Sequence, residues 1–590
     1  MTKSTLPFDK QHFKKNVLAA SDANNLLAWL CEEQCNLSNP HFDEMCQILI
    51  ELHNSNQLNF IELIDSEWLE SNIRHDFWSI QYLFTKLVPD LEVEVDLLIS
   101  VVDRLITHAG EDMLANRPNS ALREWLKRRP GEIAKLLERL KQGNDELLPN
   151  LTFVLEAGAA IDMKKYHSAA IELLADQRSL ARHSAITALG RIDTTSDETL
   201  HVLGLQKLAH FIEKRKSEDE MAVAVRALLD NFARAQLIEE AEIIRLIELT
   251  SQNASPHLHH QLAMTLHHNH TSFNTPVKLS IILALGAADP SMKGVIKEID
   301  YAFSGCIDSE NRTAIAMCLQ KFLNHPETPL QLSELEGFVH NLAKKNSDTF
   351  GWLVVHWLRS GNHASRLALP TLFRHFTKEE FELNVSLDEF DFSDTELVFV
   401  SRKTLGYLLV KPAMAASLLI SFLRNVNEKN AAKEIAELLV DPLMINFPGQ
   451  ARDIVDQAAK TEDKAQKYLQ AALEAHEKYL EGLSSMPKIR ELWPSSTKRQ
   501  VQAELQRKQI SQSFKDAQSS STFFNLIPKQ VLLHGVGIVS YVHNKGVLQR
   551  TDEVLLSSLG TSVEVPRFEF IDPLHLYHLI FEFQEESFDS

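Results

Sequence analysis

LLADQRSLARHSAITALGRI, residues 173–192, holds two apolar segments on either side of a polar turn. Leu173 and Leu174 close the first segment, and Ala185, Ala188 and Leu189 recur at helical spacing in the second. Apolar residues three and four positions apart lie on one face of an α-helix. Alanine is small, so a neighbouring helix can approach that face closely. The stretch therefore predicts two short helices that pack against similar pairs.

The pattern of these twenty residues resembles HEAT repeats, a family of helix pairs that stack into an α-solenoid. The residues that carry the resemblance are Leu173, Leu174, Asp176, Arg182, Ala185, Ala188, Leu189, Gly190 and Ile192. The resemblance implies that Asp176 lies in the turn between the helices and that Arg182 opens the second helix. It also implies that these two side chains carry a stacking ladder from one repeat to the next.

Looser copies of the pattern follow at AVAVRALLDNF (222–232), LSIILALGAAD (279–289) and TAIAMCLQKFL (313–323). Their equivalent small positions are Ala188, Ala227, Ala284 and Cys318, spaced 39, 57 and 34 residues apart. Repeats of this length are typical of solenoids, but the spacing here is uneven. We expect a mainly α fold in which an irregular HEAT-like α-solenoid occupies residues 146–375.

The rest of the chain suggests four further regions. Apolar residues recur at helical spacing in residues 1–145, for example in LLAWLCEEQ, and again in residues 401–486. Between them, FTKEEFELNVSLDEFDFSDTELVFV at 376–400 mixes acidic and apolar residues without helical spacing, so we expect an acidic loop. Residues 487–590 form the last region.

That last region combines a polar, basic helix with strand-like segments. KRQVQAELQRKQISQSFKDAQ (498–518) predicts the helix; QVLLHGVGIVSYV (530–542), VLQRTDEVLLSSLG (547–560) and TSVEVPRFEFI (561–571) predict a small sheet. Asp572 and Pro573 then start a closing helix. We therefore expect a small C-terminal α+β module.

Composition narrows the classes of protein. A chain of 590 residues has room for about four domains, and its net charge of −20 disfavours general nucleic-acid binding. Its five cysteines form no C-x-x-C pair, which suits a reducing compartment. No apolar segment follows the basic N-terminus, and no window of 18 apolar residues occurs. We expect a cytoplasmic protein without a membrane span.

Two clusters invite a metal-site hypothesis, and neither has the spacing of one. The histidines of PHLHHQLAMTLHHNH are His257, His259, His260, His267, His268 and His270, and they lack an H-E-x-x-H pair. The acidic run is Asp388, Glu389, Asp391, Asp394 and Glu396, which lacks the pattern of a calcium loop. We predict no metal and no cofactor. A solvated loop is the simplest interpretation of the acidic run, and a partner-docking loop anchored by Phe390 and Phe392 is the alternative.

Basic residues gather in two places. The candidate nucleic-acid contacts are Arg128, Arg129, Lys498, Arg499, Arg507, Lys508 and Lys515. A charged stretch of helix is usually a solvated face, but aromatic residues in or just after the second cluster, Phe514, Phe523 and Phe524, would suit bound bases. The decisive property is whether the side chains of 498–515 share one face of the helix.

No catalytic signature occurs in the sequence, which favours a non-enzymatic, protein-binding scaffold or adaptor subunit of a multi-component cytosolic system. The first alternative is a HEAT-like protein that binds DNA or RNA through the basic helices. A weaker alternative is an enzyme with its site in the C-terminal module, where His534, His543 and Arg567 are the candidate participants.

Overall fold

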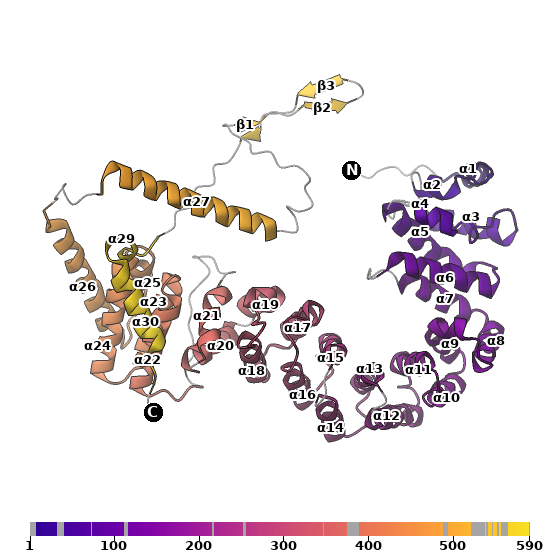
Figure 1. Ribbon diagram of the computed structural model, residues 1–590, viewed down its shortest axis with the longest axis horizontal. Coiled ribbons are helices and arrows are strands. Elements are labelled where there is room, and N and C mark those ends of the chain that lie inside the picture. The colour runs from indigo at the N-terminus through magenta and orange to yellow at the C-terminus, as the bar shows by residue number, and fades with distance from the viewer. Residues whose placement is uncertain are drawn as a thin grey trace. The chain divides into compact units, whose positions relative to one another are not determined.

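The computed structural model of the chain is built mainly of α-helices, which confirms the expected mainly α class (Figure 1). The residues that it describes are 8–31, 41–71, 74–110, 116–214, 217–251, 255–345, 347–360, 362–373, 387, 389–487, 494–520, 537–538, 541–544, 547–550, 554–555 and 564–588. The chain divides into two compact units, Met1–His375 and Phe376–Ser590.

The described residues of the first unit form helices and their connections. Its N-terminal elements are α1 (Lys10–Asp22), α2 (Leu26–Trp29), α3 (Phe42–Asn54), α4 (Ser66–Ser71), α5 (Arg74–Leu87), η2 (Val88–Asp90), α6 (Val95–Ala109), α7 (Arg117–Lys127), α8 (Pro130–Lys141), η4 (Asp145–Asn150), α9 (Leu151–Ala159) and α10 (Met163–Leu173). Its remaining elements are α11 (Ser179–Arg191), α12 (Glu198–Glu213), α13 (Glu218–Arg234), α14 (Glu240–Ser251), α15 (Pro256–Asn269), α16 (Thr275–Leu285), α17 (Lys293–Cys306), α18 (Arg312–Leu323), η5 (Leu332–Glu334), α19 (Glu336–Lys345), α20 (Ser347–Arg359) and α21 (His363–Leu372).

Short polar residues start many of these helices. The side chains that accept a hydrogen bond from the backbone N–H three residues later include those of Asp162, Asp197, Ser217, Ser255 and Asn274. Each satisfies one of the four N–H groups that a helix leaves unpaired at its N-terminus. These caps explain why the chain divides into many short helices.

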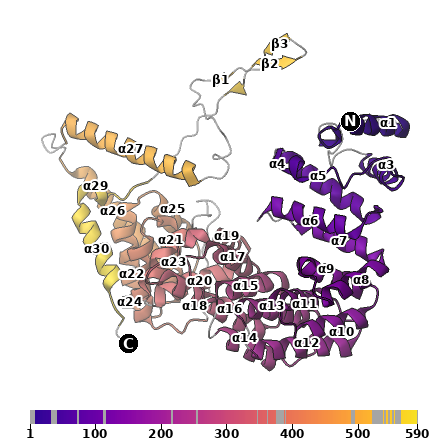
Figure 2. The same cartoon turned by 45° about the vertical axis from the view of Figure 1, so that its right-hand side comes forward.

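Alternate helices pack on one another and form two rows. One row contains α9, α11, α13, α15, α17 and α19, and the other contains α10, α12, α14, α16 and α18. Figures 1 and 2 both show these helices in the order of the sequence. A helix that contacts mainly its neighbours in sequence is compatible with a helical solenoid.

Small residues set the close approach of helices within a row. A Cβ atom on Gly190 of α11 would lie 2.9 Å from the Cβ of Ala227 on α13. On the second row, a Cβ on Gly286 would lie 2.8 Å from the Sγ of Cys318. Ala185 and Ala188 are fully buried. The small positions that the sequence singled out therefore lie where helices meet.

The second unit begins with a helical bundle. Its elements are α22 (Asp394–Leu408), α23 (Pro412–Asn425), α24 (Lys429–Leu438), the π-helical turn η7 (Leu439–Met444), α25 (Gln450–Ala458), α26 (Gln466–Ser485), α27 (Ser496–Ser520), α29 (Phe568–Ile571) and α30 (Pro573–Glu585). Helices α22, α23, α24, α25 and α26 pack on one another.

Helix α22 starts inside the segment predicted to be an acidic loop, so that prediction is wrong for residues 394–400. Ser393 and Glu396 form a capping box, in which each side chain accepts a hydrogen bond from the other residue's backbone N–H. Val398 and Phe399 are then buried on the helix. Ser393 and Glu396 have the spacing of a capping box, but the acidic composition around them is also typical of a loop.

The expected C-terminal α+β module is not supported. The described strands form two separate pairs: β1 (Gly537–Ile538) with β4 (Val554–Leu555), and β2 (Tyr541–Asn544) with β3 (Val547–Arg550). Residues 568–571, predicted to be a strand, form α29. The predicted strand segments 530–542 and 547–560 overlap β2 and β3. Alternation alone did not distinguish a strand from a short helix at Phe568.

The closing helix packs against the helical bundle. Lys403 of α22 donates from Nζ to the backbone oxygen of Gln584 over 2.8 Å, and Gln584 Nε2 donates to Gly406 O over 2.6 Å. Farther back, the Glu564 carboxylate accepts from the N–H groups of Gly449 and Gln450 at the start of α25. Residues 564–588 therefore belong to the helical part of the second unit.

Candidate protein-docking surface

The basic residues of α27 do not share one face. Lys498, Arg499, Arg507, Lys508 and Lys515 are all exposed. At about 100° per residue, Arg499, Arg507 and Lys508 lie about 100°, 180° and 280° around the helix from Lys498. Phe523 and Phe524 lie outside the described residues, as does the side chain of Phe514. The helix therefore presents charge all round, as expected of a solvated helix.

Arg128 and Arg129 lie at the junction of α7 and α8 and have different surroundings. Arg128 pairs with Asp90 and is 53% exposed. The guanidinium of Arg129 lies 4.4 Å from the ring centre of Trp125 and donates to the backbone oxygen of Leu91 over 2.7 Å. Its burial lowers its pKa. Arg129 therefore ties α7 to the turn at η2, which leaves few donors for a phosphate.

Asp176 and Arg182 meet through the backbone. Arg182 Nη1 donates to the main-chain oxygen of Asp176 over 2.8 Å, while the Asp176 carboxylate binds Arg178. The hydrogen bonds from Arg178 hold the pKa of Asp176 below its usual value. The guanidinium of Arg182 reaches the buried carboxylate of Glu220 on α13, with 2.5 Å between Nη2 and Oε1. Arg182 therefore forms its ion pair between successive helices of the row with Glu220.

The acidic segment before α22 also has structural partners. Phe390 and Phe392 are half-buried and stack on one another, with 5.4 Å between ring centres. The carboxylate of Asp394 accepts from the N–H groups of Asn427 and Glu428 just before α24. Asp388 lies outside the described residues. Asp394 therefore caps a neighbouring helix.

The histidine cluster of α15 is divided between burial and the surface. His259 is buried, and its burial lowers its pKa. His257 Nδ1 lies 3.1 Å from a carboxylate oxygen of Asp219. Within the described part of the chain, no three His, Cys, Asp or Glu side chains are placed to hold a metal ion.

Of the residues of the enzyme hypothesis, Arg567 and His543 belong to different elements. The backbone N–H of Arg567 donates to Asn446 O over 3.2 Å at the start of α29. His543 belongs to β2, where it pairs with Leu548 of β3. His534 lies outside the described residues.

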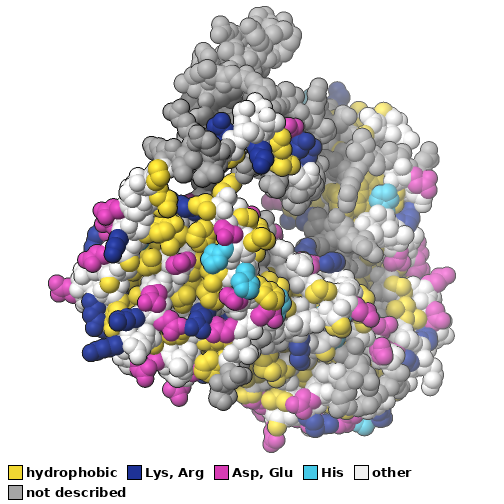
Figure 3. All heavy atoms as spheres, turned by 60° about the vertical axis from the view of Figure 1, so that its left-hand side comes forward, with side chains coloured by type: hydrophobic (Ala, Val, Ile, Leu, Met, Phe, Trp, Pro, Cys, Tyr) yellow, Lys and Arg dark blue, Asp and Glu magenta, His cyan; other side chains and the backbone are white. Residues whose placement is uncertain are grey.

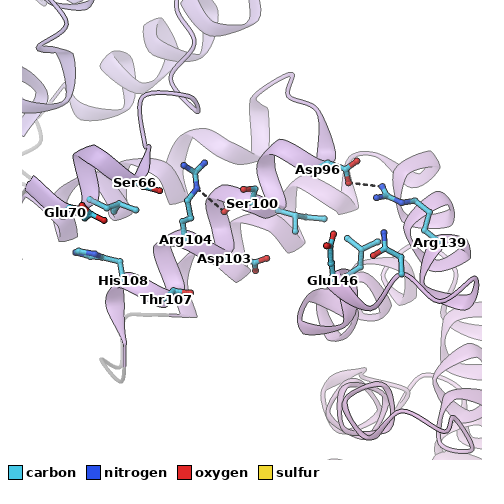
Figure 4. Close-up of a pocket in the computed structure, with 14 residues that line it drawn as sticks. Ser66, Glu70, Asp96, Ser100, Asp103, Arg104, Thr107, His108, Arg139 and Glu146 are labelled. Atoms are coloured by element: carbon cyan, nitrogen blue, oxygen red, sulfur yellow. Dashed lines mark hydrogen bonds and ion pairs between the residues drawn. The ribbon is translucent and has the colours of Figure 1, made fainter.

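A large hollow in the first unit lies among α4, α6, α8 and η4. It has a volume of about 1030 Å³. Figure 4 shows Glu70 and His108 toward one end, and Asp96, Arg139 and Glu146 toward the other. No sequence motif marks this hollow, because its 14 lining residues are scattered between positions 66 and 147.

The side chains of this hollow are tied to its own walls. Asp96 pairs with Arg139 over 2.8 Å, and Arg104 Nε donates to Ser100 O over 3.3 Å (Figure 4). Asp103 accepts from Asn150, and its burial raises its pKa. Neither of the ties drawn in Figure 4 couples a nucleophile to a general base. The hollow is lined by polar and charged side chains that a polar partner could contact.

Helix α30 presents apolar side chains both inward and outward. Its inward face carries Leu576, which is 1% exposed. Its outward face carries Leu574, Tyr577 and Phe581, at i, i+3 and i+7, with exposed fractions of 79%, 54% and 59%. A helix with apolar residues on more than one face needs more than one partner surface.

The exposed residues of α29 extend this surface. Phe570 and Ile571 are 53% and 63% exposed and immediately precede α30. We call Phe570, Ile571, Leu574, Tyr577 and Phe581 the C-terminal apolar surface. Figure 3 brings forward the side of Figure 1 that carries α26, α29 and α30, and hydrophobic side chains gather on that face. Exposed apolar patches of this kind mark interaction sites.

The sequence contained the signal for this surface. PLHLYHLIFEFQ places apolar residues all round the helix, which a helix covered on one side does not need. The same residues also predict no more than a closing helix. They do not indicate which side the bundle covers, because that depends on the contact with α22.

Comparison with known protein families finds no family model that matches the chain, and comparison with curated proteins finds no relative. No helix in the described ranges is both long enough and apolar enough to cross a membrane. The function is therefore inferred from the residues and contacts of the chain itself.

Proposed function

We propose that the chain is a non-enzymatic scaffold or adaptor that binds a partner protein on its C-terminal apolar surface. The observation that supports this most directly is the exposure of Leu574, Tyr577 and Phe581 along one face of α30. Aromatic and aliphatic anchors on a rigid helix are the usual centre of a protein interface.

The first unit supports a scaffold role as a HEAT-like repeat array. The Arg182–Glu220 contact joins α11 to α13, and Gly190 lies against Ala227 where the same two helices meet. Stacked helix pairs expose long faces that partners can bind. We place the scaffold in a multi-component cytosolic assembly, since the chain carries five cysteines without a disulfide-type pattern.

The cysteines support a non-enzymatic role. Burial raises the pKa of Cys46 to about 11 and those of Cys306 and Cys318 to about 12. The nucleophilic form of cysteine is the thiolate. These three thiols are therefore poor nucleophiles at neutral pH.

Nucleic-acid binding is the alternative that the same experiment tests. Phosphate contacts by α27 would make binding fall steeply with salt. The spread of Lys498, Arg507 and Lys508 around that helix gives less support to this alternative than the apolar surface gives to the scaffold.

The test is an affinity capture from native lysate with the full-length protein, at low and high salt, with and without nuclease. We expect discrete proteins that stay bound at high salt after nuclease treatment. The double variant Leu574→Ser, Phe581→Ser should lose them. The control Leu367→Ser changes a residue that is 54% exposed on α21 in the first unit, and it should retain them.

Two results would overturn the proposal. In one, the captured proteins are the same for the wild type and the double variant. In the other, nucleic acid is the main captured component and is lost at high salt, which would make the basic helices the working site.

A further inference from the structure

A small pocket in the first unit lies on the face formed by α11, α13 and α15. Its volume is about 260 Å³. Three arginines line it, Arg191, Arg226 and Arg234, and the one carboxylate among its lining residues is Asp230. Arginines therefore outnumber carboxylates among the lining residues, in a chain with a net charge of −20.

The arginines differ in how many donors they have left. Arg234 is committed to the backbone, because it donates to Gly190 O over 2.6 Å and to Ile192 O over 3.4 Å. Arg191 is 52% exposed, and among the described residues it has one hydrogen-bond partner, Glu156. A guanidinium has five N–H groups. Arg191 therefore keeps donors for a ligand.

Arg226 is held in place by an ion pair and a chain of hydrogen bonds. Its Nε lies 3.5 Å from Oδ2 of Asp230. Its Nη1 donates to Gln261 Oε1 over 3.0 Å, and Gln261 Nε2 lies 2.9 Å from His257 Nε2. His257 Nδ1 lies 3.1 Å from Asp219, whose carboxylate can only accept, so the imidazole proton belongs on Nδ1. His257 Nε2 then accepts from Gln261. Arg226 is oriented by this network before any ligand arrives.

Two small residues line the pocket beside the arginines. They are Gly190 and Ala227, which lie against each other where α11 meets α13. Neither residue carries a side chain longer than a methyl group. A small anion can therefore come close to charged N–H donors, where hydrogen bonds are strongest.

We infer that this pocket binds a phosphate group. Arginines reach it from two helices, α11 and α13, and a tetrahedral group offers oxygens in several directions where a carboxylate offers two in one plane. Guanidinium groups match phosphate through paired hydrogen bonds. The phosphate can belong to a small molecule or to a phosphorylated chain, since both present the same oxygens.

The first test is calorimetric titration of the full-length protein with inorganic phosphate and with pyrophosphate. We expect saturable binding that weakens by about tenfold or more in the double variant Arg191→Gln, Arg226→Gln, since both side chains would supply charge-assisted hydrogen bonds. Arg245→Gln is the control. Arg245 lies on α14, pairs with Glu213 and Glu242, and does not line the pocket.

A second pair of variants leaves the arginines in place. Thr187 lines the pocket one helical turn from both His183 and Arg191. Thr187→Glu adds a negative charge there, and Thr187→Gln adds similar volume without charge. We expect Thr187→Glu to weaken phosphate binding and Thr187→Gln to bind phosphate more tightly than Thr187→Glu. This comparison remains informative even if the double arginine variant does not fold.

The source of the phosphate is distinguished by competition with a single-stranded oligonucleotide. Displacement of pyrophosphate by the oligonucleotide would support a chain-borne phosphate, and no displacement would support a small molecule. Absence of saturable phosphate binding, equal binding by the Thr187 variants, or citrate binding as tight as pyrophosphate binding would each overturn the inference.

Discussion

Arg182 on α11 and Glu220 on α13 form an ion pair across neighbouring helices of one row. Nε of Arg182 lies 3.1 Å from Oε1 of Glu220, and the side chain of Glu220 is only 2% exposed. Ser179 Oγ donates to the same oxygen. The carboxylate is thus surrounded by donors, as a buried charge requires.

Removing one partner of this pair should destabilise the first unit strongly. We expect Glu220→Ala to cost about 3–5 kcal/mol, because it leaves the charge of Arg182, whose side chain is only 13% exposed, without its carboxylate partner. The denaturant midpoint should fall accordingly. Glu218→Ala is the control, since Glu218 is exposed in the same first turn of α13. Equal losses for both variants would show that the helix dipole, and not the ion pair, is responsible.

Adding one methyl group at the α11–α13 contact should also be costly. Gly190→Ala places a Cβ 2.9 Å from Ala227 Cβ, so the helices must separate, at a cost of about 1–3 kcal/mol. Gly294→Ala on α17 has no atom within 4 Å of the new Cβ and should be neutral or stabilising by about 0.4–1 kcal/mol. Thermal unfolding of both variants checks this. Stability of Gly190→Ala at the wild-type level would refute the close contact.

Buried histidines should make the protein less stable in acid. His167 is 2% exposed, and its pKa is lowered by burial and by the neighbouring His201. The unfolded chain takes up that proton near pH 6.5, whereas the folded state resists it. The stabilising contribution is therefore fully present above about pH 6.5 and is lost as the pH falls through the lower pKa of the folded state.

The variant His167→Gln should reduce this pH dependence. Below about pH 6.5, its free energy of unfolding should fall less steeply than that of the wild type. His12→Gln changes an exposed histidine and should follow the wild-type profile. Urea unfolding at several pH values measures both slopes. Identical slopes for His167→Gln and the wild type would exclude His167 as a contributor.

The attachment of α30 should depend on a buried lysine. Lys403 is 0% exposed and donates to Gln584 O in the last turn of α30. The helix dipole stabilises a positive charge at that end of the helix. Lys403→Met keeps the aliphatic packing but removes the donor. We expect faster amide hydrogen exchange over 573–585. Lys429→Met, an exposed position on α24, should leave that exchange unchanged.

Local sequence determined where many of the helices lie. The spacing of Ala185, Ala188 and Leu189 predicted α11, and the polar stretch from Lys498 predicted α27. These signals depend on neighbours within one or two helical turns. The same kind of reasoning failed at 394–400 and at Phe568. A capping box involves only two residues and α29 has only four, so the acidic or alternating composition of the surrounding segment outweighed both signals.

Tertiary structure alone decided which residues meet. Arg182 reaches Glu220 across 38 positions, Gln584 returns to Lys403 across 181, and Arg191 and Arg226 line one pocket from two helices. The spacing of apolar residues along the sequence does not predict such pairings, because they depend on how helices pack after they form. The exposed face of α30 has the same origin: its apolar pattern is local, but the side that stays uncovered is set by α22.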